Sequence, residues 1–200
     1  MNQLVYKILF VLGAIFILIA AALYGYGLIE DFFAGRRTDI LLEQIGIGER
    51  NELPSINEDI TDEVSIPMAA MYDNLQFSII GFISIPKIEI MLPVIDRVSD
   101  ELLKISVCWY GGEMKPEPVR MILTAHNYRS HFGKINELVY DDVVIFKSYA
   151  GEIYYYRVTG LEEISADDLE GLVQNEWDLT LLTCTKDGNR RILARCVLEH

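Results

Sequence analysis

Apolar residues are concentrated near the start of this 200-residue chain. From Ile8 to Ile29 no charged residue occurs, and Leu, Ile, Val, Phe and Ala predominate. A run of more than twenty such residues is long enough to cross a bilayer as a helix. Tyrosines near both ends of the run suit the membrane interface. We therefore predict a transmembrane anchor over 8–29, preceded by a short tail over 1–7.

A cleavable signal peptide is the main alternative for this segment. Ala20, Ala21 and Ala22 supply the small residues that follow an apolar stretch in such peptides. The stretch is long for a signal peptide and continues past the alanines through Leu23 and Tyr24. We therefore favour a retained anchor.

The next part of the chain, 30–75, is predicted to be a linker and an N-terminal arm. Ile40 to Ile47 keeps an apolar face, which can continue a helix or pack on the following domain. Glu49 to Ser65 is acidic, contains Pro54 and lacks periodicity, which is typical of a solvated linker. Asp59 to Ala70 can still form a helix or arm against the domain.

Beyond Gln76 the pattern changes to short apolar and β-branched runs separated by turns, which predicts strands. The expected strands are Phe77–Ile85, Lys87–Ile95, Val119–Thr124, Asp142–Ser148, Glu152–Leu161, Asp178–Cys184 and Arg190–Arg195. Short helices are expected at Ser99–Ser106, Phe132–Leu138 and Ser165–Val173, and a loop from Trp109 to Pro118. Many short strands with brief helices predict a small, mainly β barrel.

Composition argues against several classes of function. A net charge of −13 argues against the basic surface that nucleic-acid binding requires. Three scattered cysteines are too few for a disulfide framework and form no metal-binding pair. Two of them, Cys108 and Cys196, are expected to pack as hydrophobes, with a bridge between them as the alternative.

The last two predicted strands place a thiol beside positive charge. Cys184 ends the first strand, a polar turn containing Asp187–Asn189 follows, and Arg191 begins the second. His126 follows the end of another predicted strand. A cysteine at a strand end is commonly inert packing, but an imidazole and a guanidinium group nearby would make it reactive. These three side chains can meet at one edge of a sheet.

Three segments carry a family resemblance, and they occur in the family's order. They are Thr180-Leu181-Leu182-Thr183-Cys184, Ala125-His126-Asn127 followed by His131-Phe132-Gly133 and Leu138, and Arg191-Ile192-Leu193. The chain resembles the sortases, the cysteine transpeptidases of Gram-positive surfaces, over roughly 76–197. The resemblance implies an eight-stranded sortase-type β-barrel with short helices, preceded by the N-terminal transmembrane helix. Residues 198–200 are read as a possible tag remnant.

The resemblance also implies the roles of the three groups. Cys184 would be the nucleophile, His126 the general acid and base, and Arg191 the donor to the oxyanion. His131 is the competing histidine, but His126 has the family's position after a small residue at a strand end. Arg190 is the competing arginine, and strand alternation lets only one of the two point at the thiol.

A sortase would cleave an LPxTG-like sorting signal between Thr and Gly and pass the acyl group to an amine. That amine belongs to a peptidoglycan precursor or to a pilin. Ala125, Asn127, Leu182 and Thr183 are expected to line the peptide groove, with the loop Leu161–Trp177 setting specificity. No cofactor or metal is expected. Calcium is the alternative, and its candidate ligands are Glu162, Glu163, Asp167 and Asp168, with Glu113 or Glu117.

Membrane orientation is left open by charge, because Lys7 and the amino terminus on one side nearly balance Arg36 and Arg37 on the other, which Glu30 and Asp31 offset in part. The resemblance implies a cytoplasmic tail and an extracellular catalytic domain on a single-pass anchor. No Asp-Pro-Trp lid is seen in the arm, which favours a cell-wall-anchoring enzyme over a pilin-polymerising one. The non-enzymatic alternative is a membrane-anchored adhesin or sensor ectodomain in which Cys184 is part of the core.

Overall fold

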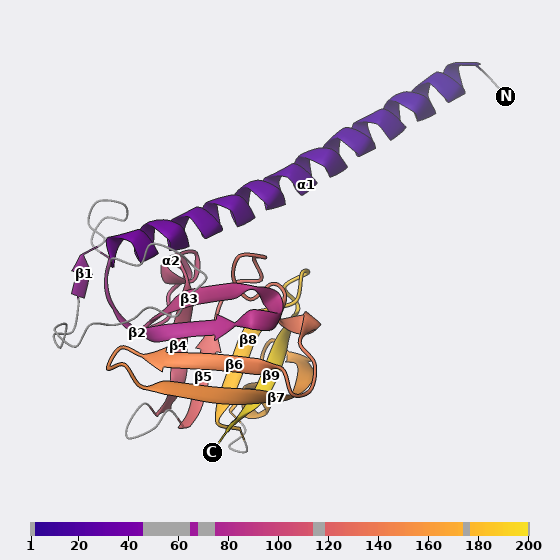
Figure 1. Cartoon of the computed structure of the whole chain (residues 1–200). Coiled ribbons are helices and arrows are strands. Elements are labelled where there is room, and N and C mark those ends of the chain that lie inside the picture. Colours follow the sequence, from indigo (N-terminus) through magenta and orange to yellow (C-terminus); the bar gives the residue numbers. More distant parts are fainter. Residues whose placement is uncertain (1–2, 46–64, 68–74, 114–118, 174–176, 200) are drawn as a thin grey trace.

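A long helix and a β-barrel make up the molecule (Figure 1). The computed structural model describes residues 3–45, 65–67, 75–113, 119–173 and 177–199. The helices are α1 (Gln3–Gln44), α2 (Asp100–Leu103) and α3 (Leu169–Leu172), with 3-10 turns η1 (Pro86–Ile88) and η2 (Ile135–Glu137). The strands are β1 (Ser65–Pro67), β2 (Gln76–Ile85), β3 (Ile90–Ile95), β4 (Val107–Glu113), β5 (Val119–Thr124), β6 (Val143–Ser148), β7 (Ile153–Ser165), β8 (Leu179–Cys184) and β9 (Arg190–Leu198).

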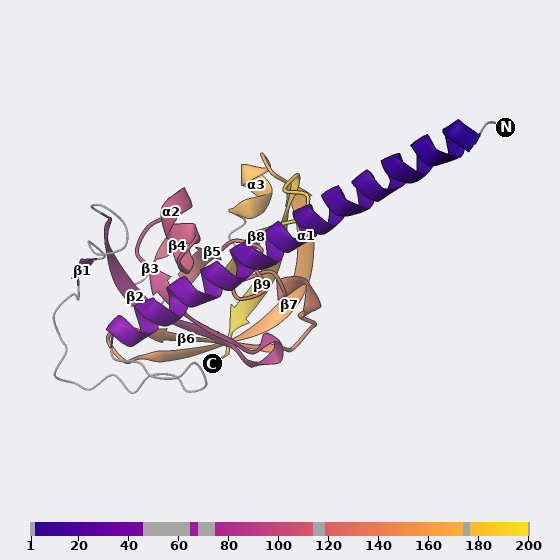
Figure 2. The same cartoon turned by 90° about the horizontal axis from the view of Figure 1, so that it is seen from above.

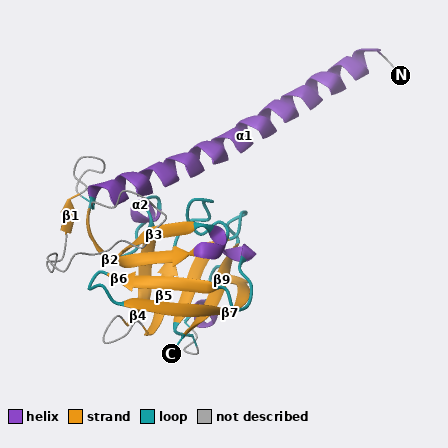
Figure 3. Cartoon of the chain, in the orientation of Figure 1, coloured by secondary structure: helices purple, strands orange, loops and turns teal. Residues whose placement is uncertain are grey.

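The strands form one sheet that closes on itself. Their order is β1-β2-β3-β4-β5-β8-β9-β7-β6, and β6 also pairs with β2. The short β1 only adds to the start of β2, so the other eight strands form the closed barrel. Closure leaves these eight strands without a free edge. The predicted mainly β, eight-stranded barrel with short helices is confirmed, as Figure 3 shows.

Alternation along β8 separates the barrel interior from its outer surface. Leu179 and Leu181 point into the main core, whereas Leu182 belongs to a second cluster outside it. Side chains two apart in a strand share a face, so Cys184 lies on the same outer face as Leu182. The outer cluster is formed by Ile122, Leu172, Leu182 and Leu193, with Ile164 packed against it. This face carries the candidate site.

Helix α1 combines a bare apolar part with a part that packs on the barrel. It is long and apolar enough to cross a membrane, and the most apolar stretch is unburied. Near its C-terminal end Ala34, Thr38 and Leu41 are fully buried. The Thr38 hydroxyl donates a hydrogen bond of 2.6 Å to the carbonyl of Ile105. Figure 2 shows the helix crossing over one side of the barrel, so one continuous helix both leaves the domain and packs on it.

Some predicted boundaries were wrong. Of the loop expected from Trp109 to Pro118, residues 109–113 belong to β4, because backbone pairing with β5 extends as far as Glu113, and residues 114–118 lie outside the described residues. Strand β7 continues to Ser165 rather than ending at Leu161, because it pairs with β9 along this length. Ser165 therefore ends a strand, and α3 starts later with Asp168 as its cap, whose carboxylate accepts from the Gly171 amide at 2.8 Å.

The two remaining cysteines pack separately. Cys108 lies in the cluster beneath α1 and α2, whereas Cys196 lies in the barrel core. Both are free and fully buried. Burial raises the pKa of the Cys108 thiol to about 12 and raises that of Cys196 as well. Both side chains are thus protonated, unreactive packing groups, as one of the two sequence interpretations predicted.

Candidate active site

The segments that carry His126 and Cys184 are joined by hydrogen bonds on both sides of each residue. The Thr183 hydroxyl donates to the carbonyl of Ala125 at 2.8 Å. The Asn127 amide donates to the carbonyl of Thr185 at 3.1 Å. The residues flanking the imidazole are therefore bonded to the residues flanking the thiol. This arrangement holds the two candidate catalytic residues on neighbouring segments.

These bonds extend the pairing of two parallel strands. Strands β5 and β8 pair in parallel, with Thr124 opposite Leu182, and the amide of Ala125 donates to the carbonyl of Leu182 at 3.1 Å. Because parallel strands end at the same side of a sheet, their C-terminal residues arrive together. His126 and Cys184 lie on neighbouring segments for this reason, and both are partly exposed.

Arg191 lies opposite Cys184 on the next strand. Cys184 and Arg191 are direct partners in the antiparallel β8–β9 pair, so their side chains lie on one face. The Arg191 guanidinium donates to the carbonyls of Gly188 and Arg190 at 3.1 and 3.2 Å. Within the described ranges no carboxylate pairs with it, which leaves donors for an incoming oxygen atom.

The competing arginine is occupied elsewhere. Arg190 is exposed and forms an ion pair of 2.8 Å with Glu163. It also donates to the Glu163 carbonyl at 2.8 Å. As its side chain leaves β9 on the face opposite to that of Arg191, it is directed away from the thiol.

His131 lies away from the site, beneath α1. Its side chain is fully buried, and its Nε2 atom is 3.1 Å from the Thr38 hydroxyl. The loop from His126 is tight here, because the Gly133 amide donates to the Tyr128 carbonyl at 2.8 Å. A Cβ atom at Gly133 would overlap the backbone of Asn127 and Tyr128. The histidine segment thus carries one partly exposed imidazole and one buried imidazole.

The environment of His126 favours its neutral form. Partial burial lowers the pKa of its imidazole, and the nearby Lys104 charge lowers it further. Asp100 and Glu30 act in the opposite direction with smaller effects. The Tyr128 ring lies 5.1 Å from the imidazole, centroid to centroid. Near neutral pH the resting imidazole is therefore able to accept a proton.

The four residues expected to line the groove occupy different environments. Leu182 belongs to the apolar cluster on the outer face. Ala125 and Thr183 are buried, and with Asn127 they form the hydrogen bonds that join the His126 and Cys184 segments. Three of the four therefore form hydrogen bonds that hold the segments of His126 and Cys184 together.

The candidate calcium ligands are dispersed. Glu162 pairs with Arg195 at 2.9 Å, and Glu163 pairs with Arg190. Asp167 accepts from the Ser165 hydroxyl at 2.5 Å, and Asp168 caps α3. In the part of the chain that the structure describes, no group of three acidic, histidine or cysteine side chains could hold a metal ion. Glu117 lies outside the described residues, and Glu113 is placed only as part of β4.

Sequence reasoning missed two sets of residues around the site. Arg195 is buried on β9 four positions beyond Arg191, and its partners lie far from it in the chain. Asp31 of α1 accepts from the Ser130 amide at 3.2 Å and so contacts the His126 loop. The only available signals were the alternation of β9, which puts Arg195 on the same face as Arg191, and the polar positions in the helix after the anchor.

Comparisons with known proteins identify the family of the chain. A family model described as Sortase domain matches residues 83–199, which is more than half of the chain. The chain therefore belongs to the sortase family, as the three motifs predicted. No curated protein matches the sequence.

Solved sortase structures of several classes resemble the chain. Sortase C1 from Streptococcus suis is 27% identical with a TM-score of 0.55, over 61% of this chain and 73% of that one. Sortase A from Corynebacterium diphtheriae is 22% identical with a TM-score of 0.57, covering 64% and 63%. A Clostridium perfringens sortase D5 transpeptidase is 20% identical with a TM-score of 0.54, covering 61% and 79%. The similarity to three classes supports the fold without selecting a subclass.

Proposed function

We propose that the chain is a cysteine transpeptidase that cleaves an LPxTG-like sorting signal between Thr and Gly. It would transfer the acyl group to an amine of a peptidoglycan precursor and so attach surface proteins to the cell wall. The observation that carries this proposal is the paired bonding of the His126 and Cys184 segments, with Arg191 opposite the thiol. The apolar helix would anchor the enzyme by a single pass, with the domain outside the cell.

The chemistry follows from the three groups. The Cys184 thiol gives its proton to His126, and the sulfur attacks the threonine carbonyl carbon. Arg191 donates to the oxyanion that forms. When the C–N bond breaks, the His126 imidazolium gives its proton to the departing glycine amine, which leaves a thioester on Cys184. An acceptor amine then attacks the thioester and loses a proton to His126. The sulfur departs and regains that proton.

The apolar cluster beside Cys184 supports a peptide substrate. Ile122, Leu182 and Leu193 form an outward-facing cluster on three adjacent strands, and Leu172 of α3 packs over it, so that each of these residues is at most 8% exposed. Apolar side chains preceding the scissile bond can pack along the margin of this cluster, beside α3. The same cluster ends at the thiol, so a peptide bound there presents its carbonyl to the sulfur.

A peptide assay tests the proposal. The full chain in detergent is incubated with a quenched LPxTG peptide, with and without an amine acceptor, and analysed by mass spectrometry. We expect a covalent adduct with the mass of the acyl fragment on Cys184, and an amide product when the acceptor is present. A scrambled peptide of the same composition is the control. Absence of both adduct and cleavage with a panel of LPxTG-like peptides would reject the proposal.

A pilin-building activity is the second candidate, favoured by one observation. A pilus-related sortase C of Group B Streptococcus is 26% identical to this chain, above the 22% of sortase A from Corynebacterium diphtheriae. The same assay separates the two candidates through the acceptor. Transfer to a lysine-bearing pilin fragment in preference to a peptidoglycan stem peptide would favour pilin assembly.

We expect the acid limb of the pH profile to lie below 6.5. Because burial and Lys104 lower the pKa of His126, the imidazole stays able to take the thiol proton below the usual pH. Lowering the pH through the folded pKa protonates it and slows acylation. Because the unfolded state binds this proton more readily, stability also falls as the pH drops from 6.5 towards the lower folded pKa of His126, and this loss is complete below that pKa.

The measurement is kcat/KM for the peptide from pH 5 to 8, together with an NMR titration of His126. Lys104→Gln should move both midpoints to higher pH, because it removes one cause of the depression. Lys87→Gln is the matched control and should leave them in place. A His126 midpoint at or above 6.5 in the unmodified chain contradicts this prediction.

A further inference from the structure

Arg195 is a positively charged residue that is buried on the outer face of the barrel. Its side chain is 1% exposed, on the face of β9 that also carries Leu193 and Arg191. It lies opposite Thr180, as Arg191 lies opposite Cys184. A buried guanidinium group is unfavourable unless it is paired and hydrogen-bonded. Its partners therefore show what the residue holds together.

Those partners come from three separate segments. The Nε atom donates to Glu162 on β7 at 3.0 Å, and Nη2 forms the 2.9 Å ion pair with the same carboxylate. Nη1 donates to the Thr180 hydroxyl of β8 at 3.1 Å. It also donates to the carbonyl of Leu172 at 3.0 Å, and Nη2 donates to that of Gly171. One side chain thus joins β7, β8 and β9 to α3.

The carbonyl contacts are the informative ones. Gly171 and Leu172 are in the last turn of α3, where carbonyls have no partner within the helix. By accepting from a guanidinium group these carbonyls fix a helix of a single turn, which would be unstable by itself. The helix is thereby held where Leu172 contacts the apolar cluster containing Leu182 and Leu193. Arg195 thus sets the position of the wall over that surface.

The contacts of Arg195 with Glu162, Thr180 and α3 form a clamp, which lies nearer the start of β8 than the thiol does. Thr180 and Cys184 share one face of β8 and are four residues apart. At about 3.3 Å per residue the separation is ~13 Å, the length of about four extended residues. A peptide whose carbonyl reaches Cys184 therefore extends toward the part of the wall that Arg195 fixes.

We propose that Arg195 is a positioning residue for peptide binding, with Glu162 as its counter-ion. It holds α3 as the wall of the groove and takes no part in bond making. The inference rests on the proposed function, because it assumes a peptide on the outer face of β8. Loosening the clamp should weaken peptide binding and leave the reactivity of the thiol unchanged.

Two reactions of Cys184 test this separation. Iodoacetamide needs only the thiol and its proton acceptor, and the buried Cys108 and Cys196 do not compete for it. Acylation by the LPxTG peptide needs the groove as well. Both rates are measured on the full chain in detergent for Glu162→Gln and Arg195→Lys. Glu163→Gln, which alters the neighbouring ion pair on the opposite face, is the matched control.

For Glu162→Gln and Arg195→Lys we expect KM for the peptide to rise about ten- to a hundredfold, since small displacements of a binding wall have effects of this size. The alkylation rate should stay within about twofold, and hydrogen exchange of the 169–173 amides should accelerate. Glu163→Gln should change none of these quantities.

An unchanged KM in both clamp variants, or alkylation falling in parallel with acylation, overturns the inference while leaving the proposed function in place. An unmodified chain that is alkylated but processes no peptide overturns the proposed function, and the inference fails with it.

Discussion

Replacing Cys184 with alanine should remove peptide turnover by at least ~10⁴-fold and abolish the covalent adduct, because no other described group can carry the acyl intermediate. The thiol is partly exposed, and a hydrogen bond joins the segment of His126 to the segment of Cys184. Removing one sulfur atom at this position should leave the fold unchanged. The measurement is intact-mass analysis after exposure to the peptide, with circular dichroism as the test of folding.

A second thiol provides the control for this substitution. Cys108→Ala removes a sulfur atom that lies in the cluster beneath α1 and α2. It should cost some stability and leave the adduct in place. Equal activity in Cys184→Ala and the unmodified chain would end the transpeptidase interpretation. The chain would then be better explained as an anchored adhesin or sensor that keeps the sortase fold.

Arg191→Ala should lower kcat about 10²- to 10³-fold, the usual effect of removing one oxyanion donor. Its guanidinium lies on the face of Cys184, and its hydrogen bonds go to backbone carbonyls of the turn. The charge is therefore available to a developing oxyanion. KM should change far less than kcat, because the contact strengthens in the transition state.

Arg190→Ala is the matched control for Arg191→Ala. Arg190→Ala removes the same side chain one position away, together with an exposed ion pair to Glu163. Exposed pairs contribute little to stability, so activity and melting temperature should stay close to those of the unmodified chain. A similar loss in both variants would indicate that the turn is damaged and that Arg191 has no specific role. Steady-state kinetics on the quenched peptide give kcat and KM for both variants.

Local patterns predicted the strands and a mainly β barrel, and the resemblance to the sortases supplied the number of strands and the roles of the three candidate catalytic residues. Alternation assigned the strands around His126 and Cys184. The turn at Gly188, which has a positive φ of 75°, was visible as a polar break between two apolar runs. Once two strands are known to be parallel neighbours, their last residues must lie together. The motif residues therefore indicated the site before any coordinates.

Long-range contacts were invisible to the same reasoning. Nothing in the residues around Arg195 indicates that Glu162, 33 positions earlier, neutralises it. Thr38 and Ile105 are 67 positions apart, and their bond joins the end of α1 to the barrel. Glu162 and Glu163 looked like free acids in a loop, but the pairing of β7 with β9 places them on opposite faces, each facing a different arginine. Such contacts depend on the closure of the sheet.

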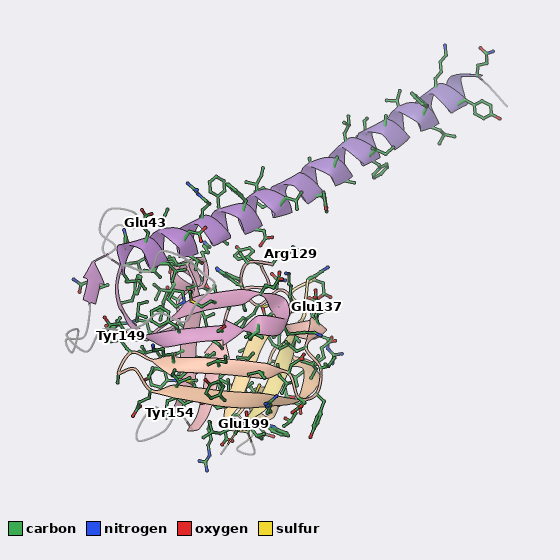
Figure 4. All side chains as sticks on the ribbon, in the orientation of Figure 1. Glu43, Arg129, Glu137, Tyr149, Tyr154 and Glu199 are labelled. Carbon is green, nitrogen blue, oxygen red and sulfur yellow. The ribbon has the colours of Figure 1, made fainter. Side chains whose placement is uncertain are left out.

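The seating of α1 on the barrel determines how far the enzyme can reach. A helix of 42 residues is about 63 Å long, and the predicted span would use about 33 Å of it. Asp31, only two residues after that span, accepts a hydrogen bond from Ser130 at the rim that carries the His126 loop. In Figure 4 Arg129 of this loop lies on the α1 side of the barrel, and Glu199 lies at the far end. An anchor that continues as the same helix onto the barrel would hold the domain at a fixed distance from the membrane. The catalytic rim would stay at the lipid headgroups, within reach of substrates that are themselves held in the bilayer.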